Sequence, residues 1–215
     1  MLLAACAGCG NDGDETPSLE PGGVPVVLVH GYGGNPESLR VLGRRLRSRG
    51  RPVLYAELPD RGTADIRRSG KAVADAVRDA KAEAVELVGF SLGGLAVRSY
   101  LRFERGAARA RRVVLVGTPN HGTALAASAP SRRCQYGCAD MAPGSSFLRA
   151  LNAGDDTPGR ARYVSLYSRF DEIVVPPRTS RLKGARNIAL GAPAISHVGL
   201  VTDPRALRLI VAALD

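Results

Sequence analysis

Lysine, aromatic residues and long apolar runs are all scarce in this chain of 215 residues. The only lysines are Lys71, Lys81 and Lys183, so arginine supplies most of the formal charge of +10. Aromatic residues make up 5% of the chain, which leaves few side chains to stack on nucleic-acid bases. No nucleic-acid-binding motif is present, and no apolar run reaches the ~18 residues of a membrane-spanning helix. We therefore expect no nucleic-acid partner and interpret the basic residues as a solvated surface, which could also favour anionic membranes.

The first 23 residues differ in composition from the rest. Leu3-Ala4-Ala5-Cys6 resembles the lipobox of a bacterial lipoprotein, and the Gly, Asp, Glu and Pro residues that follow suit a flexible tether. Residues 1–5, however, are too short for a signal peptide and carry no basic side chain. We expect an exported bacterial protein, either secreted or anchored in the cell envelope through a lipid on Cys6. Either the true start lies upstream of Met1 or the resemblance is accidental, and the alternative to export is a frayed cytosolic N-terminus.

Residues 24–215 contain no internal repeat and no second domain boundary, and their length and apolar content predict one globular domain. We expect a monomer, although no residue pattern determines the oligomeric state. Cys134 and Cys138 form a close pair, which in an exported protein favours a disulfide; two inert thiols are the alternative. No third ligand lies near this pair, so we expect no metal site there.

Short apolar runs alternate with helical patterns from residue 24 onward. Six runs predict strands, at residues 24–29, 52–58, 84–90, 112–117, 162–168 and 187–191. The intervening patterns predict helices that begin at Pro36 after an Asn35 N-cap, at about residue 63, at Leu92 and with Asp203-Pro204, whereas residues 118–160 are expected to be irregular. The alternation predicts an α/β fold with a mostly parallel six-stranded sheet and helices on both faces. Functional residues of such sheets gather at the carboxyl ends of the strands.

Gly89-Phe90-Ser91-Leu92-Gly93 matches the G-x-S-x-G pattern between a predicted strand and a predicted helix. Such a turn presents the serine hydroxyl above the sheet at a helix N-terminus, which favours developing negative charge. We predict that Ser91 is a nucleophile; a plain helix N-cap is the alternative.

Acyl transfer by a serine needs backbone donors for the oxyanion. We assign one to the N–H of Leu92, directly after the nucleophile, and the other to the N–H of Tyr32, in the glycine-rich loop His30-Gly31-Tyr32-Gly33-Gly34. An ordinary glycine-rich turn is the alternative. His30 is expected to hold this loop by hydrogen bonds.

The order of a serine triad in this kind of fold, Ser, then Asp or Glu, then His, selects the other two members. Only His197 follows the last predicted strand, whereas His121 precedes every plausible acid and is interpreted as a residue that lines the cleft or orders its loop. Asp171 follows the strand at residues 162–168 and is the predicted acid, with Glu172 as its nearest rival. Asp203 is better explained as a helix N-cap.

With these residues in place, the chain resembles the small bacterial lipases of the α/β-hydrolase superfamily, the lipase A-like group. The segments that carry this resemblance are VLVHGYGG (27–34), VGFSLGG (88–94), VGTPNHGT (116–123), YSRFDEIVVP (167–176) and the loop around His197. The resemblance implies a minimal α/β-hydrolase fold with the triad Ser91, Asp171 and His197 and the oxyanion donors Tyr32 and Leu92. The chain departs from many of these lipases in carrying Phe90 before the nucleophile and in lacking an obvious lid insertion.

The expected activity is two-step hydrolysis of a carboxylic ester, such as an acylglycerol, with no metal or organic cofactor. Tyr32, Leu92 and Val198 are expected to contact the acyl chain. Residues 124–160 could form a small cap that favours esterase over lipase behaviour. An acyltransferase or amidase with the same triad remains an alternative, as does an inactive hydrolase-like protein that binds ligands at the cell surface.

Overall fold

The computed structural model describes residues 23–129, 134 and 136–215. Its centre is a parallel sheet with the strand order β2-β1-β3-β4-β5-β6. The strands are β1 (Val26–Val29), β2 (Val53–Ala56), β3 (Val85–Phe90), β4 (Ala110–Val116), β5 (Arg162–Ser168) and β6 (Arg186–Leu190). All six predicted strands are present, and the predicted fold class is confirmed.

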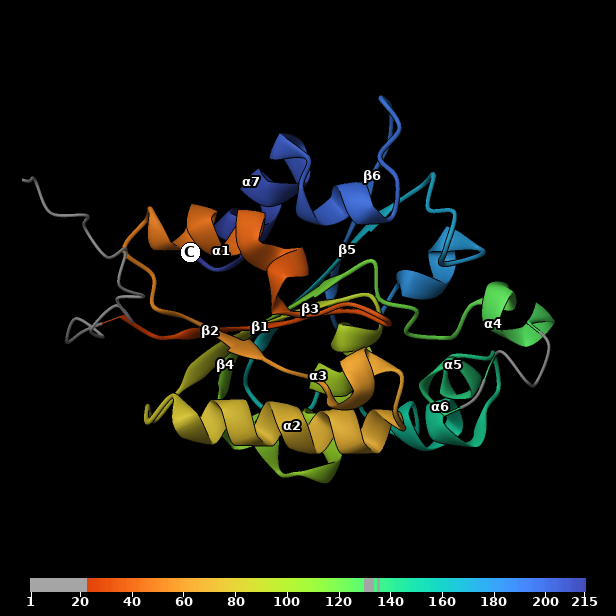
Figure 1. The fold of residues 1–215 in the computed structure, drawn as a ribbon, viewed down its shortest axis with the longest axis horizontal. Helices are drawn as coiled ribbons and strands as arrows, with labels where there is room; N and C mark the ends of the chain where they lie inside the picture. The colour runs from red at the N-terminus through yellow and green to blue at the C-terminus, as the bar shows by residue number, and fades with distance from the viewer. Residues whose placement is uncertain (1–22, 130–133, 135) are drawn as a thin grey trace, which may run out of the picture.

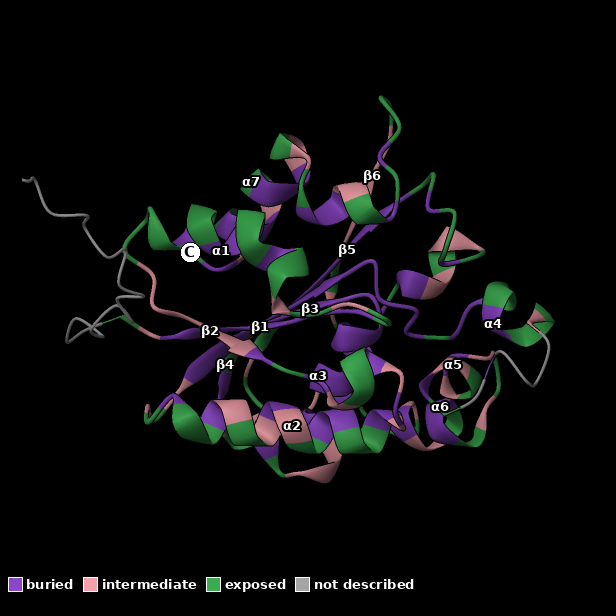
Figure 2. Ribbon diagram, in the orientation of Figure 1, coloured by how far each residue is buried: buried purple, intermediate pink, exposed green. Residues whose placement is uncertain are grey.

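Helices cover both faces of the sheet (Figure 1). One face packs against α1 (Arg40–Arg47) and α7 (Pro204–Ala213), and the other against α2 (Ile66–Asp79) and α3 (Leu92–Phe103). Each face has its own core cluster, and Figure 2 shows the buried residues of the strands between them. The central strands are buried on both faces, which explains why β1 is apolar throughout.

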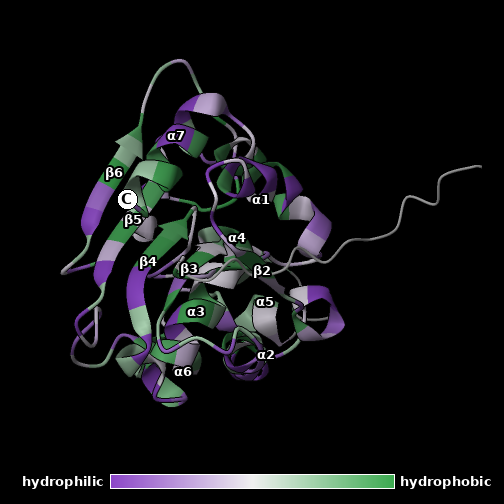
Figure 3. Ribbon diagram, turned by 90° about the vertical axis from the view of Figure 1, so that its left-hand side faces the viewer, coloured by the Kyte–Doolittle hydropathy of each residue, from purple (hydrophilic) through white to green (hydrophobic). Residues whose placement is uncertain are grey.

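Polar residues mark the beginnings of β4, β5 and β6. Arg111 and Arg112 lie in the first half of β4, Arg162 begins β5 and Arg186 begins β6. Figure 3 shows these strands as hydrophilic at their starts and hydrophobic toward their carboxyl ends. The apolar part of the sheet therefore leads toward the edge where the predicted site residues follow the strands.

Three side chains cap helices: Asn35 and Asp203, as the sequence suggests, and Asp65, which was not predicted. Asn35 caps a 3-10 helix, Pro36–Leu39, and the α-helix proper starts only at Arg40. Asp65 accepts hydrogen bonds from the first turn of α2, so this helix begins three residues later than predicted. Asp203 accepts from the N–H of Arg205 and caps α7, as predicted. The remaining 3-10 helices are Pro59–Gly62, Gly106–Ala108, Pro177–Ser180 and Val198–Val201.

The segment predicted to be irregular contains three short helices, α4 (Ala124–Ser128), α5 (Gly137–Asp140) and α6 (Ser146–Leu151). They have four to six residues each, too few for a repeating apolar pattern to be recognised. A disulfide joins Cys134 to Cys138 in this segment. None of the helices among the described residues has the length and apolar character needed to span a lipid bilayer. Cys6 and its tail lie outside the described residues, so anchoring through Cys6 stays a prediction.

Candidate active site

A cavity of about 420 Å³ opens at the carboxyl ends of the central strands. Ser91, His197 and Tyr32 lie in its wall with a largely apolar set of neighbours. The other lining residues are Gly31, Phe90, Pro119, Thr123, Leu125, Ala126, Ala129, Cys138, Met141, Ile173, Val174 and Val198. The cavity therefore joins one reactive hydroxyl and one imidazole to an apolar surface.

Ser91 occupies a strained turn between β3 and α3. Its φ of 55° and ψ of −127° are rare for a residue with a side chain, and the side chain is nevertheless nearly buried. A Cβ on Gly93 would lie 2.3 Å from the carbonyl oxygens of Val29 and His30. Only glycine permits this close approach, which brings the end of β1 and its loop beside the serine.

His197 and Asp171 form a buried, hydrogen-bonded pair. Asp171 Oδ2 lies 2.8 Å from His197 Nδ1, while Oδ1 accepts from the backbone N–H groups of Ile173 and Val174 at 3.0 and 2.8 Å. The backbone thus fixes the carboxylate that orients the ring. His197 Nε2 is buried and forms no hydrogen bond with any described residue, Ser91 included. Such bonds are often long before substrate binds, so the unpaired Nε2 is compatible with a base that acts on Ser91.

Two neighbours shape the space around the imidazole. The ring of Phe90 lies 4.9 Å from that of His197, centroid to centroid. Gly117, at the end of β4, has a φ of 56°, and a Cβ there would lie 3.1 Å from His197 Cε1. Phe90, noted in the sequence only as a departure, therefore packs beside the ring next to the nucleophile.

Glu172, the rival acid, contacts a different atom of the same histidine. Its Oε2 accepts a hydrogen bond from the backbone N–H of His197 at 3.0 Å, and Asp171 alone is bonded to the ring. The sequence placed both carboxylates in one loop and favoured Asp171, and it is Asp171 that faces the imidazole in the structure.

The residues expected to bind the oxyanion and the acyl chain differ in where their side chains lie. Tyr32 and Val198 line the cavity and are exposed. The expectation that the Leu92 side chain contacts an acyl chain is wrong, because it is fully buried in the core cluster of α2 and α3. As the first residue of α3, Leu92 packs between the helix and the sheet, so only its backbone N–H is available for a role at the site.

The other two histidines, His30 and His121, are not members of the predicted triad. Buried His30 contacts the carbonyl oxygen of Gly31 through Nδ1 at 2.9 Å and accepts from the N–H of Leu58 through Nε2 at 3.2 Å. Burial lowers the pKa of His30, in keeping with a neutral ring that holds the loop. His121 is exposed and does not line the cavity; its N–H donates to the carbonyl of Thr179. Of the two roles expected for His121, ordering of its own loop fits the structure, and lining of the cleft does not.

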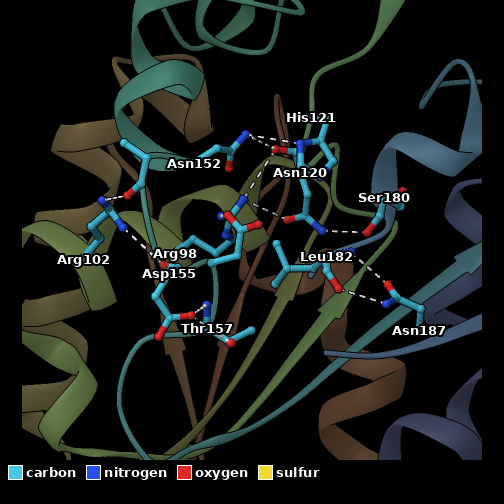
Figure 4. Close-up of polar contacts among 12 residues, drawn as sticks. Arg98, Arg102, Asn120, His121, Asn152, Asp155, Thr157, Ser180, Leu182 and Asn187 are labelled. Atoms are coloured by element: carbon cyan, nitrogen blue, oxygen red, sulfur yellow. Dashed lines mark hydrogen bonds and ion pairs between the residues drawn. The ribbon is translucent and has the colours of Figure 1, made fainter. Parts of the chain in front are cut away.

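A buried polar network centred on Arg98 and Asn120 was missed by sequence reasoning (Figure 4). Arg98 of α3 pairs with Asp156 at 2.9 Å and lies 3.4 Å from both oxygens of Asn120. Asn120 in turn donates to the carbonyl of Ser180 at 2.6 Å, and Asn152 donates to the backbone oxygen of Asn120. The network links the helix that follows the nucleophile to the loops after β4 and β5.

Two of the three short helices in the segment predicted to be irregular, α4 and α5, form part of the cavity wall. Leu125, Ala126 and Ala129 come from α4 and its end, and Cys138 and Met141 from α5 and its end. The disulfide partner Cys138 is thus part of the wall, and the role of residues 124–160 as a small cap stays a prediction. No group of three His, Cys, Asp or Glu side chains in the described part of the chain is arranged to bind a metal ion.

No protein-family model matches the chain. Its structure is similar to that of lipase B from Aspergillus fumigatus, with a TM-score of 0.78 and 22% identity over 92% of this chain and 54% of the lipase. It is also similar to the mature form of a lipase from Bacillus licheniformis, with a TM-score of 0.76 and 20% identity over 91% of this chain and 93% of that one. An esterase from a Rhodococcus species matches with a TM-score of 0.58 and 17% identity over 88% and 90% of the two chains.

These similarities define the fold. The chain has the α/β-hydrolase fold, as its six-stranded parallel sheet and covering helices indicate. It spans about half the length of the Aspergillus lipase and nearly the whole of the mature Bacillus lipase.

Proposed function

We propose that this protein is a serine hydrolase that cleaves carboxylic esters, with Ser91 as nucleophile, His197 as general base and Asp171 as the orienting acid. The observation that carries the proposal is the buried pair of His197 and Asp171, joined at 2.8 Å, of which His197 lines the same cavity as Ser91. A carboxylate on Nδ1 favours the tautomer with its proton there and leaves the Nε2 lone pair to accept the serine proton.

The proposed reaction has two steps that use the same groups. Ser91 Oγ attacks the acyl carbon while His197 takes its proton and passes it to the leaving alcohol. Water, activated by His197, then releases the acid from the acyl-enzyme. The backbone N–H groups of Leu92 and Tyr32 are the proposed oxyanion donors, and the N-terminus of α3 adds favourable electrostatics beside Ser91.

The apolar lining supports an acyl chain as the bound part of the substrate. Tyr32, Leu125, Ile173 and Val198 line the cavity and are also exposed large hydrophobic residues. Similar structures include proteins named as lipases and an esterase, which is compatible with acylglycerols or simpler acyl esters as substrates. We infer that Cys138 and Met141 contact the acyl chain on the side of the cavity formed by α5.

A panel of p-nitrophenyl esters of rising chain length tests the proposal, with Ser91→Ala as the paired variant. We expect turnover by the wild type, covalent labelling of Ser91 by a fluorophosphonate, and loss of both in the variant. Turnover that survives Ser91→Ala would remove the assignment. Added alcohols and anilide substrates distinguish hydrolysis from acyl transfer and amidase activity, and a folded wild type inert to every probe would favour a binding protein.

A further inference from the structure

The segment that follows β5 holds the His197 loop at three points. Ser168 Oγ donates to the carbonyl of Ile195 at 2.5 Å, Asp171 binds the His197 ring, and Glu172 accepts from the His197 N–H. We propose that Glu172 is a positioning residue, whose carboxylate clamps the backbone of His197 and so keeps the ring in register with Asp171 and Ser91. The inference rests on the proposed function and names a further residue for the same site.

The backbone of His197 needs such an anchor because of its place in the fold. Residues 191–197 form no regular helix or strand, and His197 directly precedes the 3-10 helix Val198–Val201. The N–H of a residue at this N-cap position has no acceptor within its own helix. Glu172 supplies the acceptor from a separate segment, and a hydrogen bond to a carboxylate is stronger than one to a neutral oxygen.

The carboxylates of Asp171 and Glu172 bind different parts of His197. Asp171 is buried, and its second oxygen is occupied by the N–H groups of Ile173 and Val174. Glu172 is exposed and reaches the main chain of His197 instead of the ring. Asp171 thus fixes the rotation of the imidazole, whereas Glu172 fixes the position of the Cα from which it projects. Both constraints are needed, since a displacement of the base by about 1 Å can cost two orders of magnitude in rate.

Three substitutions separate the hydrogen bond from the charge. Glu172→Gln keeps an acceptor oxygen and loses the charge, Glu172→Asp keeps the charge on a shorter side chain, and Glu172→Ala removes both. Glu83→Ala, at an exposed glutamate before β3, is the matched control. For a p-nitrophenyl ester we expect Glu172→Ala to lower kcat roughly 10- to 100-fold, with KM changed by no more than about twofold. Glu172→Gln should recover most of this loss, and Glu83→Ala should match the wild type.

Other results would overturn the inference. Wild-type kcat in Glu172→Ala, or a lower Tm with unchanged kcat, would leave Glu172 without a positioning role. Glu172→Gln could instead be as slow as Glu172→Ala, with the acidic limb of its profile of kcat/KM against pH displaced from that of the wild type. That result would show that the charge of Glu172, and not its hydrogen bond, matters. If Glu172→Gln abolishes activity and Asp171→Asn does not, Glu172 is the acid. Should Glu172→Ala not fold, a Gln variant slower than the Asp variant would also refute the clamp.

A second measurement separates the clamp from the proposed function. The proton on His197 Nδ1, bonded to Asp171, should give a downfield resonance in proton NMR of the wild type. We expect it to broaden or vanish in Glu172→Ala and to persist in Glu172→Gln. If the wild type hydrolyses no ester and no fluorophosphonate labels Ser91, the proposed function fails, yet this resonance still decides whether Glu172 orders His197. An unchanged resonance in Glu172→Ala would refute the clamp.

Discussion

At the scale of single residues, the three histidines show how environment decides chemistry. His30 is buried between two backbone groups, His121 is exposed, and His197 is bonded to Asp171 in the cavity wall. Chain order was enough to select His197 from the sequence, because the base of such a triad follows the last strand. The structural role of His30 was also expected, and its two hydrogen bonds agree with it.

The buried ring of His30 predicts a loss of stability on acidification. Desolvation lowers the pKa of His30 below the ordinary 6.5, so the unfolded chain binds a proton at a higher pH than the folded chain. The contribution of His30 is therefore complete above about pH 6.5 and is lost as the pH falls through the lowered value. We expect His30→Gln to reduce the slope of the unfolding free energy between about pH 7 and pH 5 in urea titrations. His121→Gln, at an exposed histidine, should keep the wild-type slope; equal slopes in all three proteins would contradict the prediction.

At the scale of elements, the buried ion pair of Arg98 and Asp156 joins α3 to the segment before β5. The pKa of Arg98 is lowered to about 10, chiefly by desolvation, with Asp156 opposing that shift. The guanidinium thus stays charged at neutral pH at a cost that its partners must offset. Arg98 lies on α3, the helix that has Ser91 at its N-cap, so the pair ties this helix to the segment before β5.

Removal of Asp156 alone should therefore be more damaging than removal of the whole pair. We expect Asp156→Ala to lower the unfolding free energy by about 3–5 kcal/mol, since it leaves the Arg98 charge buried without its partner. Arg98→Met combined with Asp156→Ala should cost less than the single Asp156 variant, as measured by chemical denaturation. Asp75→Ala breaks the exposed pair with Arg78 on α2 and should cost no more than about 1 kcal/mol. A double variant as unstable as the sum of its parts would refute the coupling.

At the scale of the whole molecule, the sheet separates two core clusters. Leu42 of α1 belongs to the cluster on one face and Leu95 of α3 to the cluster on the other, and both are fully buried. Truncation of either leucine leaves a cavity, and only the residues on the same face of the sheet can move to fill it. The parallel sheet between them limits direct contact, so each layer should respond to a small core change on its own.

Additivity of core substitutions tests this separation. Leu42→Ala and Leu95→Ala should each cost about 2–5 kcal/mol, and their effects should add to within about 0.5 kcal/mol. Leu207 of α7 shares a cluster with Leu42, so the pair Leu42→Ala and Leu207→Ala should depart from additivity. Urea denaturation of the single and double variants measures both sums. Strong coupling across the sheet, between Leu42 and Leu95, would contradict the prediction.

The elements with regular patterns were predictable, and the short ones were not. All six strands were foreseen from short apolar runs: β1 is buried and apolar throughout, whereas the edge strands β2 and β6 are only partly buried. Helices α4, α5 and α6 were missed, although α4 and α5 build part of the cavity wall, since their few residues are held by contacts with the rest of the protein. The network of Arg98 was also missed, because its members are far apart in the chain and no local spacing marks them.

The sequence by itself determined the order of strands and helices and the glycine-flanked turn of Ser91. These features depend on local spacing and on backbone conformations that few residues can adopt. Only the tertiary structure decided that Asp171 meets the ring of His197 while Glu172 meets its backbone, and that the Leu92 side chain lies in the core. The direction of a side chain depends on packing between segments that are distant in the chain, and no local pattern contains that information.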